Sequence, residues 1–125
     1  MCKQIGYEDP CGMAGIWLNN LNSTMEVCCK DGQLHGQYMM GVGDAEDYYE
    51  LSGRYTMIGG DCVFGWSIAY NNKVHGNSNA SCSWSGAHFA DSDRINSHWV
   101  LIRHTKPEDY WSSTMINHDD FRRKC

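Results

Sequence analysis

Large apolar residues alternate with small or polar residues along several short segments of this chain. The clearest segment runs from residue 62 to residue 70, and its larger members are Cys62, Phe64, Trp66, Ile68 and Tyr70. A period of two is typical of a β-strand that buries one face. Similar alternation occurs within 34–40, 80–86 and 95–101, whereas no helical stripe of useful length is present. The pattern therefore predicts an all-β protein.

Turn signals separate these segments and set the expected number of strands. The pair Asp31-Gly32 is a strong hairpin signal, and stretches rich in Gly, Asn or Asp follow other segments. We expect strands at 15–21, 23–29, 33–40, 48–57, 62–71, 78–89, 94–104 and 110–121. Eight sequential strands predict an antiparallel up-and-down β-barrel, because closure removes the exposed edges of the sheet. The interior of such a barrel holds side chains or one small ligand.

Length and charge narrow the class of protein. The 125 residues fit one domain, and the net charge of −5 disfavours a nucleic-acid partner, which a basic face usually binds. No apolar run approaches the roughly 20 residues of a membrane-spanning helix. We assign 11–121 to the barrel, 1–10 to a loose N-terminal extension and 122–125 to a basic, solvated C-terminal tail.

Cysteine is frequent for a chain of this length. The seven cysteines are Cys2, Cys11, Cys28, Cys29, Cys62, Cys82 and Cys125. This number favours an oxidising compartment, with disulfide bonds and secretion, and its being odd requires a free or interchain thiol. Two N-x-S/T acceptors, at Asn22 and Asn79, support secretion only weakly. The pairing of the cysteines stays open.

Five tryptophans and a few polar residues suggest a ligand pocket. Three polar side chains on the first three strands, Asn19, Ser23 and Tyr38, offer an amide, a hydroxyl and a phenol to a carbonyl-like oxygen. Asp119 offers an acceptor for an N–H group, and Trp84 and Trp99 offer walls for an apolar ligand body. Each residue alone has an ordinary structural role, but the combination predicts an apolar pocket with polar anchors.

Several segments resemble, in order and spacing, the avidin and streptavidin family. Gly15-Ile16-Trp17-Leu18-Asn19-Asn20-Leu21-Asn22-Ser23 is similar to the first-strand pattern G-x-W-x-N-x-L-x-S of that family. The further matches are Gly32-Gln33-Leu34-His35-Gly36-Gln37-Tyr38, Leu51-Ser52-Gly53-Arg54-Tyr55, Gly65-Trp66, Trp84-Ser85-Gly86, Arg94-Ile95-Asn96-Ser97-His98-Trp99, Trp111-Ser112-Ser113-Thr114 and His118-Asp119-Asp120-Phe121. The resemblance extends over residues 11–121.

The resemblance implies an avidin-like barrel that binds biotin without catalysis and without a cofactor. It implies that Asn19, Ser23 and Tyr38 donate to the ureido oxygen and that Asp119 accepts from a ureido N–H. It places Tyr70, Cys82, Trp84, Trp99 and Leu101 around the ligand, Met40 beside a ureido N–H, and Val42 in the loop that closes over the ligand. It also implies a homo-oligomer, more often a tetramer than a dimer, in which Trp111 covers the site of a neighbouring subunit. Sequestration or defence is the expected role.

Some positions depart from the family pattern. Met40 stands where a Ser commonly bonds a ureido N–H, and a thioether is a weak acceptor. Ala80 and Cys82 replace a Ser and a Thr that contact the ligand, so we expect weaker binding than in the strongest members. Cys11 matches one half of an avidin disulfide, but His88 stands at the partner position.

Other functions have weaker support in the sequence. The sequence has no C-x-x-C pair and no histidine spacing suitable for zinc, its histidines are spread over different strands, and no nucleophile–base pattern suggests an enzyme. A lipocalin-like carrier of another small apolar ligand is the main alternative, although three convergent donors argue against it. A purely structural or interaction module is a further alternative.

Overall fold

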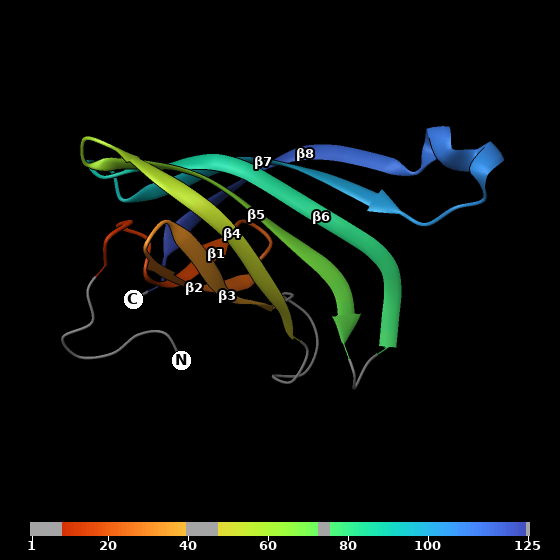
Figure 1. Ribbon diagram of the computed structural model, residues 1–125, viewed down its shortest axis with the longest axis horizontal. Helices are drawn as coiled ribbons and strands as arrows, with labels where there is room; N and C mark the ends of the chain where they lie inside the picture. Colours follow the sequence, from red (N-terminus) through yellow and green to blue (C-terminus); the bar gives the residue numbers. More distant parts are fainter. Residues whose placement is uncertain (1–8, 40–47, 73–75, 125) are drawn as a thin grey trace.

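Eight antiparallel strands close into a barrel in chain order (Figure 1). The computed structural model describes residues 9–39, 48–72 and 76–124. The strands are β1 (Gly15–Asn19), β2 (Thr24–Lys30), β3 (Gln33–Met39), β4 (Tyr48–Ile58), β5 (Asp61–Asn72), β6 (Gly76–Phe89), β7 (Arg94–Arg103) and β8 (Thr114–Arg123). The predicted all-β, eight-stranded up-and-down barrel is confirmed. No helix among the described residues is long and apolar enough to cross a membrane.

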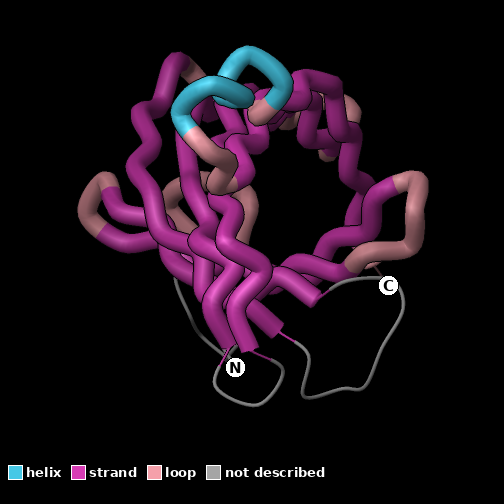
Figure 2. The backbone as a smooth tube through the Cα atoms, turned by 90° about the vertical axis from the view of Figure 1, so that its right-hand side faces the viewer, coloured by secondary structure: helices cyan, strands magenta, loops and turns pink. Residues whose placement is uncertain are grey.

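The interior of the barrel is the hydrophobic core that the period-two pattern predicts. Along β5, Cys62, Phe64, Trp66 and Ile68 are buried while the residues between them are exposed. Figure 2 shows the strands as a closed ring around this interior. Only side chains at the inward positions of the strands reach this interior. A ligand site inside the barrel therefore has to be built from such inward side chains.

Two glycines allow neighbouring strands to approach closely. A Cβ atom added to Gly36 would lie 1.8 Å from the backbone oxygen of Glu26, and one added to Gly53 would lie 1.9 Å from that of Gly65. Backbone atoms have no flexible end that moves aside. Any side chain at these two positions would therefore separate β3 from β2 and β4 from β5.

The last predicted strand begins later and ends later than expected. Residues Pro107–Ser112 form a 3₁₀ helix, η1, and β8 starts only at Thr114. Proline favours the start of a helix because its φ is fixed and it has no N–H to satisfy. The turn is closed by backbone bonds from Asp109 N to Lys106 O and from Ser113 N to Tyr110 O, both 2.9 Å long. Trp111 therefore lies on a helical turn outside the sheet.

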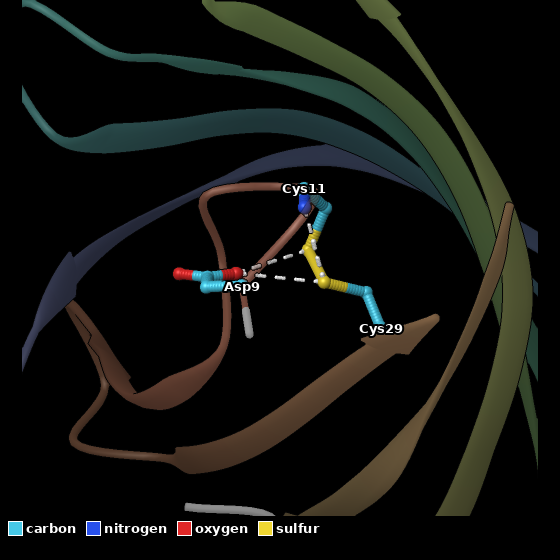
Figure 3. Close-up of side chains that lie close together, drawn as sticks. All are labelled: Asp9, Cys11 and Cys29. Atoms are coloured by element: carbon cyan, nitrogen blue, oxygen red, sulfur yellow. Dashed lines mark hydrogen bonds between the residues drawn. A yellow bond between two sulfur atoms is a disulfide. The ribbon is translucent and has the colours of Figure 1, made fainter. Parts of the chain in front are cut away.

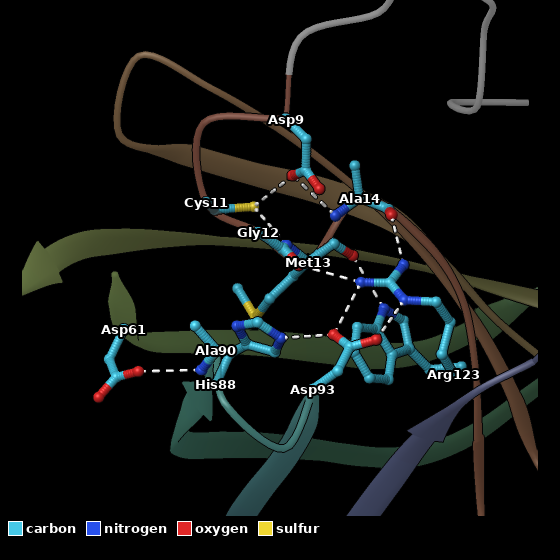
Figure 4. A network of polar contacts seen from close by, with 11 residues as sticks. Asp9, Cys11, Gly12, Met13, Ala14, Asp61, His88, Ala90, Asp93 and Arg123 are labelled. Carbon is cyan, nitrogen blue, oxygen red and sulfur yellow. Dashed lines mark hydrogen bonds and ion pairs between the residues drawn. The ribbon is translucent and has the colours of Figure 1, made fainter. Parts of the chain in front are cut away.

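The expected solvated tail at 122–125 is wrong for Arg122 and Arg123, which belong to β8. The Arg123 guanidinium donates to both carboxylate oxygens of Asp93, at 2.8 and 3.1 Å, and to the carbonyls of Gly12 and Ala14 (Figure 4). The same guanidinium lies 4.3 Å from the ring centroid of Trp17. These contacts attach the end of the chain to its beginning, so Arg123 is a structural residue and not a charge on a mobile tail.

A disulfide between Cys11 and Cys29 attaches the segment before β1 to β2 (Figure 3). Asp9 Oδ1 lies 3.6 and 3.5 Å from the two sulfur atoms. Because oxidised sulfur carries no proton, these are close contacts and not hydrogen bonds. Cys28 is also disulfide-bonded, whereas Cys62 and Cys82 are free and buried. The predicted presence of disulfides is confirmed.

His88, at the position where the family pattern suggested a disulfide partner, has a different role. Its Nε2 lies 2.8 Å from Asp93 Oδ1, and its ring contacts the edge of Trp17 at a centroid distance of 5.7 Å. Arg123 and His88 both stabilise the ionised carboxylate, so the pKa of Asp93 falls from 3.8 to about 2. His88 thus joins the Asp93–Arg123 ion pair to the core.

Replacing Cys11 and Cys29 together with alanine should lower the free energy of unfolding by about 3 kcal/mol, because the cross-link restricts the unfolded chain. Chemical denaturation followed by circular dichroism measures this change. The matched control is Cys62→Ala, which removes a buried sulfur without a cross-link and should cost less. Equal losses in both variants would show that the disulfide adds nothing beyond packing.

Asp93→Asn should destabilise the protein by about 1 kcal/mol at neutral pH, a value reduced for the partial exposure of this carboxylate. The pKa of Asp93 is lowered by folding, so its contribution is present above pH 3.8 and is lost as the pH falls through about 2. Wild type and variant should converge in thermal stability at that acidic limit. Asp91→Asn, in the same turn, serves as control, and a difference that persists at low pH would contradict the assignment.

Candidate functional site

The turn between β1 and β2 fixes the orientation of Asn19. Its side-chain oxygen accepts hydrogen bonds from the backbone N–H groups of Leu21 and Ser23, at 3.0 and 2.9 Å. Asn22 has a positive φ of 63°, a conformation that asparagine tolerates and that lets the chain reverse tightly. With its oxygen held by the turn, Asn19 directs its NH₂ group away from the turn, toward Tyr38 and Asp119.

Asn19 and Tyr38 form the centre of a buried polar cluster. Asn19 Nδ2 donates to the Tyr38 hydroxyl at 3.2 Å, and both residues are buried. Ser23, also buried, hydrogen-bonds to Tyr38 and lowers its pKa, but burial of the phenol has the larger effect. The net result raises the pKa of Tyr38 to about 12. Tyr38 therefore keeps its proton at physiological pH and remains a hydrogen-bond donor.

Asp119 of β8 faces this cluster from the opposite end of the sequence. Asn19 Nδ2 donates to Asp119 Oδ2 at 3.3 Å, and the hydroxyl of Ser97 donates to the Asp119 backbone oxygen at 2.6 Å. Burial raises the pKa of the Asp119 carboxyl, while Asn19 and Trp84 favour its charged form. The Trp84 indole N–H is buried and points toward Asp119, yet it makes no full hydrogen bond to any described residue. The cluster thus combines donors with one acceptor.

Aromatic rings surround the polar cluster. Trp84 and Trp99 are direct cross-strand neighbours on β6 and β7, and the Trp84 ring lies 5.5 Å from that of Tyr38 and 6.2 Å from that of Trp66. Trp84 is buried, whereas Trp99 is only half-buried. The half-buried ring leaves apolar surface for a ligand to cover.

The second wall comes from β4, β5 and β6. Tyr70 packs edge-on against Tyr49 at a centroid distance of 5.0 Å. Cys82 is paired across the strands with Leu101 and interacts with Tyr70. Burial raises the pKa of the Cys82 thiol to about 12 and raises the pKa of Tyr70 as well. Both groups stay protonated, so this wall is uncharged.

Sequence reasoning missed Tyr49. The register places it directly opposite Tyr38, and the period-two pattern of β4 puts it on the same face as the buried Leu51. That pattern was the available signal, but no motif marked the position. Tyr49 supports Tyr70 and belongs to the wall.

The structure gathers most of the predicted site residues but not all. Those at the polar cluster or its walls are Asn19, Ser23, Tyr38, Tyr70, Cys82, Trp84, Trp99, Leu101 and Asp119. Trp111 lies apart, on η1 beyond the end of the barrel, with 84% of its surface exposed (Figure 1). Met40 and Val42 lie outside the described residues. Trp17 and Trp66 are core residues, as expected.

One group of potential metal ligands lies among the described residues, away from the polar cluster. Among the described residues, Asp9, Cys11 and Cys29 place ligand atoms within 4.8 Å of one another. The two sulfurs are bonded to each other, however, and a metal needs deprotonated thiolates. This group is therefore a disulfide with a neighbouring carboxylate. The polar cluster itself is suited to hold a neutral, planar ligand that has a carbonyl oxygen beside an N–H.

Comparison with known proteins agrees with this geometry. The model of the avidin family matches residues 7–124. Avidin-related protein 4/5 of Gallus gallus is 25% identical over 124 residues, which cover 92% of this chain and 79% of that protein. The family match extends over all eight strands, so it includes the polar cluster and its aromatic walls.

Chemical denaturation at a series of alkaline pH values should detect the burial of Tyr38. The pKa of Tyr38 is raised by folding from 10 to about 12, so its stabilising effect is complete below pH 10 and is lost as the pH rises through about 12. The free energy of unfolding of wild type should fall by about 2 kcal/mol more than that of Tyr38→Phe across this interval. Tyr55→Phe provides the control, and equal slopes in all three proteins would contradict the assignment.

Proposed function

The chain belongs to the avidin family, a family of biotin-binding proteins and not of enzymes, and on this basis we propose that it binds biotin non-covalently inside its barrel. The observation that carries the proposal is the convergence of Asn19, Tyr38 and Asp119 within hydrogen-bond distance. A ureido group has one oxygen flanked by two N–H groups, which matches donors placed beside an acceptor. The biological role that we propose is sequestration or defence.

The ureido oxygen would be held by the Asn19 amide, the Ser23 hydroxyl and the Tyr38 phenol. Asn19 is already fixed by two backbone N–H groups, and Tyr38 is buried and protonated. Such donors lose little freedom when a ligand arrives, and their bonds are stronger in a dry interior than in water. Biotin would replace the weak 3.2 Å bond between Asn19 and Tyr38 with bonds to its own oxygen.

Asp119 would accept a hydrogen bond from one ureido N–H. Its carboxylate is half-buried. It accepts a 3.3 Å hydrogen bond from Asn19, and the Trp84 indole N–H points toward it without a full hydrogen bond, so a further donor would stabilise its charge. A buried acceptor without good partners is costly, and a ligand that supplies the missing donor recovers that cost. Asp119 therefore selects for a ligand with an N–H beside its carbonyl.

The apolar ring system of biotin would pack between the indoles of Trp84 and Trp99, with Tyr70 and Leu101 at the other side. The raised pKa values of Tyr70 and Cys82 keep this wall uncharged, which suits a thioether ring. Cys82 in place of a hydroxyl residue, and Ala80 in place of a serine, reduce the polar contacts of the ligand. With Met40 at a position that in the family offers a hydroxyl, these residues set an affinity below that of the strongest members.

Members of the family form oligomers, and we propose that this chain forms a tetramer and is secreted. Trp111 is 84% exposed on η1, beside the 63% exposed Tyr110. Neighbouring large apolar side chains that are exposed together commonly mark a protein–protein contact. In the proposed assembly, Trp111 covers the biotin site of a neighbouring subunit.

Isothermal titration calorimetry with biotin tests the proposed site. Wild type should bind one biotin per chain with micromolar or tighter affinity, and Tyr38→Phe should weaken binding roughly 5- to 100-fold by removing one donor to a buried oxygen. Tyr55→Phe, at a tyrosine outside the polar cluster, should bind like wild type. Absence of saturable binding in wild type, together with displacement of a hydrophobic dye by fatty acid, would instead support an apolar carrier.

Light scattering coupled to size exclusion tests the role of Trp111. We expect a tetramer, and Trp111→Ala should weaken biotin binding by about tenfold or more through the loss of a large apolar contact. Leu21→Ala, at another highly exposed apolar residue, is the control and should change neither mass nor affinity. Unchanged affinity in a tetrameric Trp111→Ala protein would contradict the shared site.

A further inference from the structure

The outer face of β7 and β8 carries a pair of histidines that the biotin site does not use. His98 and His118 are direct cross-strand partners, their ring centroids are 6.3 Å apart, and both residues are exposed. Successive residues of a strand point to opposite faces. Trp99 and Asp119 belong to the proposed ligand pocket, so the two histidines that precede them project away from it.

The spacing of the two rings suits coordination of one metal ion. Histidine nitrogen binds Zn²⁺ at about 2.0–2.1 Å, and two such bonds from one nitrogen on each ring place the ring centroids roughly 5–6 Å apart. The observed 6.3 Å therefore needs only a small rotation of exposed side chains. Antiparallel pairing holds the two backbones in place, so little entropy is lost on binding.

A carboxylate and an amide complete the surroundings of His118. Its Nδ1 lies 3.6 Å from Asp120 Oδ2, and Asp120 Oδ1 accepts a 3.0 Å hydrogen bond from Asn96. Histidines that ligate metals commonly donate the N–H of their second nitrogen to such a carboxylate, which fixes the tautomer and strengthens the ligand. With Nδ1 facing Asp120, Nε2 of His118 is the nitrogen directed to the metal.

We propose that His98 and His118 bind a divalent transition-metal ion that prefers imidazole, such as Zn²⁺, Ni²⁺ or Cu²⁺, on the outer surface of the barrel. Asp120 acts as the positioning residue for His118, and Asn96 holds Asp120. Two imidazoles supply two ligands, and water completes the coordination. Ca²⁺ and Mg²⁺ prefer oxygen ligands and do not suit this pair.

The site is invisible to a search of sequence spacing. His98 and His118 are 20 positions apart, and the one H-x₃₋₅-H spacing in the sequence joins His98 to His104 and not to His118. They become neighbours only through the register of β7 with β8, in which Asn96 also meets Asp120. The expected absence of a metal site rested on spacing and on the spread of the histidines over different strands, and the pairing of β7 with β8 brings two of those histidines together.

Calorimetric titration of the chelator-treated full-length chain with ZnCl₂ alone, at about pH 7.5 where imidazole is largely neutral, tests the site. We expect one ion per chain, at least tenfold weaker binding in His98→Ala and in His118→Ala, and about tenfold weaker binding in Asp120→Asn. His35→Ala, at an exposed histidine of β3, should bind like wild type. Zn²⁺ should also raise the melting temperature of wild type by several degrees. It should leave that of the His98→Ala/His118→Ala double variant unchanged.

Three outcomes would overturn the proposal. These are Zn²⁺ binding that survives in the double variant, one ion bound per two chains, and equal effects of His35→Ala and His98→Ala. Because all of the substituted histidines are exposed, circular dichroism should show the same fold in each variant. Biotin titration of the double variant should match wild type, so this site and the ligand pocket are tested separately.

Discussion

The pairing of β1 with β8 is the constraint on which the rest of this molecule depends. Only three residue pairs join the two strands, Trp17 with Arg123, Leu18 with Arg122 and Asn19 with Phe121. These few pairs close the sheet and bring Asn19 within 3.3 Å of Asp119, although the two residues are 100 positions apart. Arg123 strengthens this short pairing. Its guanidinium binds Asp93 through two hydrogen bonds and also donates to the carbonyls of Gly12 and Ala14.

The two ends of the barrel have different tasks. One end is cross-linked by the Cys11–Cys29 disulfide and the Asp93 ion pairs, which fix the entry of the chain into β1. Asn19, Ser23 and Tyr38 belong to the polar cluster at the other end of β1, where rigidity would serve the proposed ligand binding as well as stability. The contacts that hold β1 against β8 thus also hold these hydrogen-bond donors in fixed positions.

The fold was largely predictable from the sequence because it follows from local patterns, whereas the residues of the inner site were predicted from the segments that resemble the family. Alternation along β5 marked its buried residues, and hairpin signals marked the strand ends. The role of Arg123 was not predictable, because it depends on a seam between the first and last strands. The late start of β8 was missed since Pro107 and the turn after it were read as a strand boundary and not as a helical turn. Tyr49 and the His98–His118 pair likewise depend on register, which single positions do not encode.

The distribution of the five indoles has an optical consequence. Trp17, Trp66 and Trp84 are buried, Trp99 is half-buried, and Trp111 is 84% exposed. Indole emission moves to longer wavelength as its surroundings become wetter, so in the separate chain Trp111 contributes the red side of the spectrum and the buried rings contribute the blue side. One emission spectrum therefore reports separately on the interior of the barrel and on the surface around η1, with no label attached to the protein.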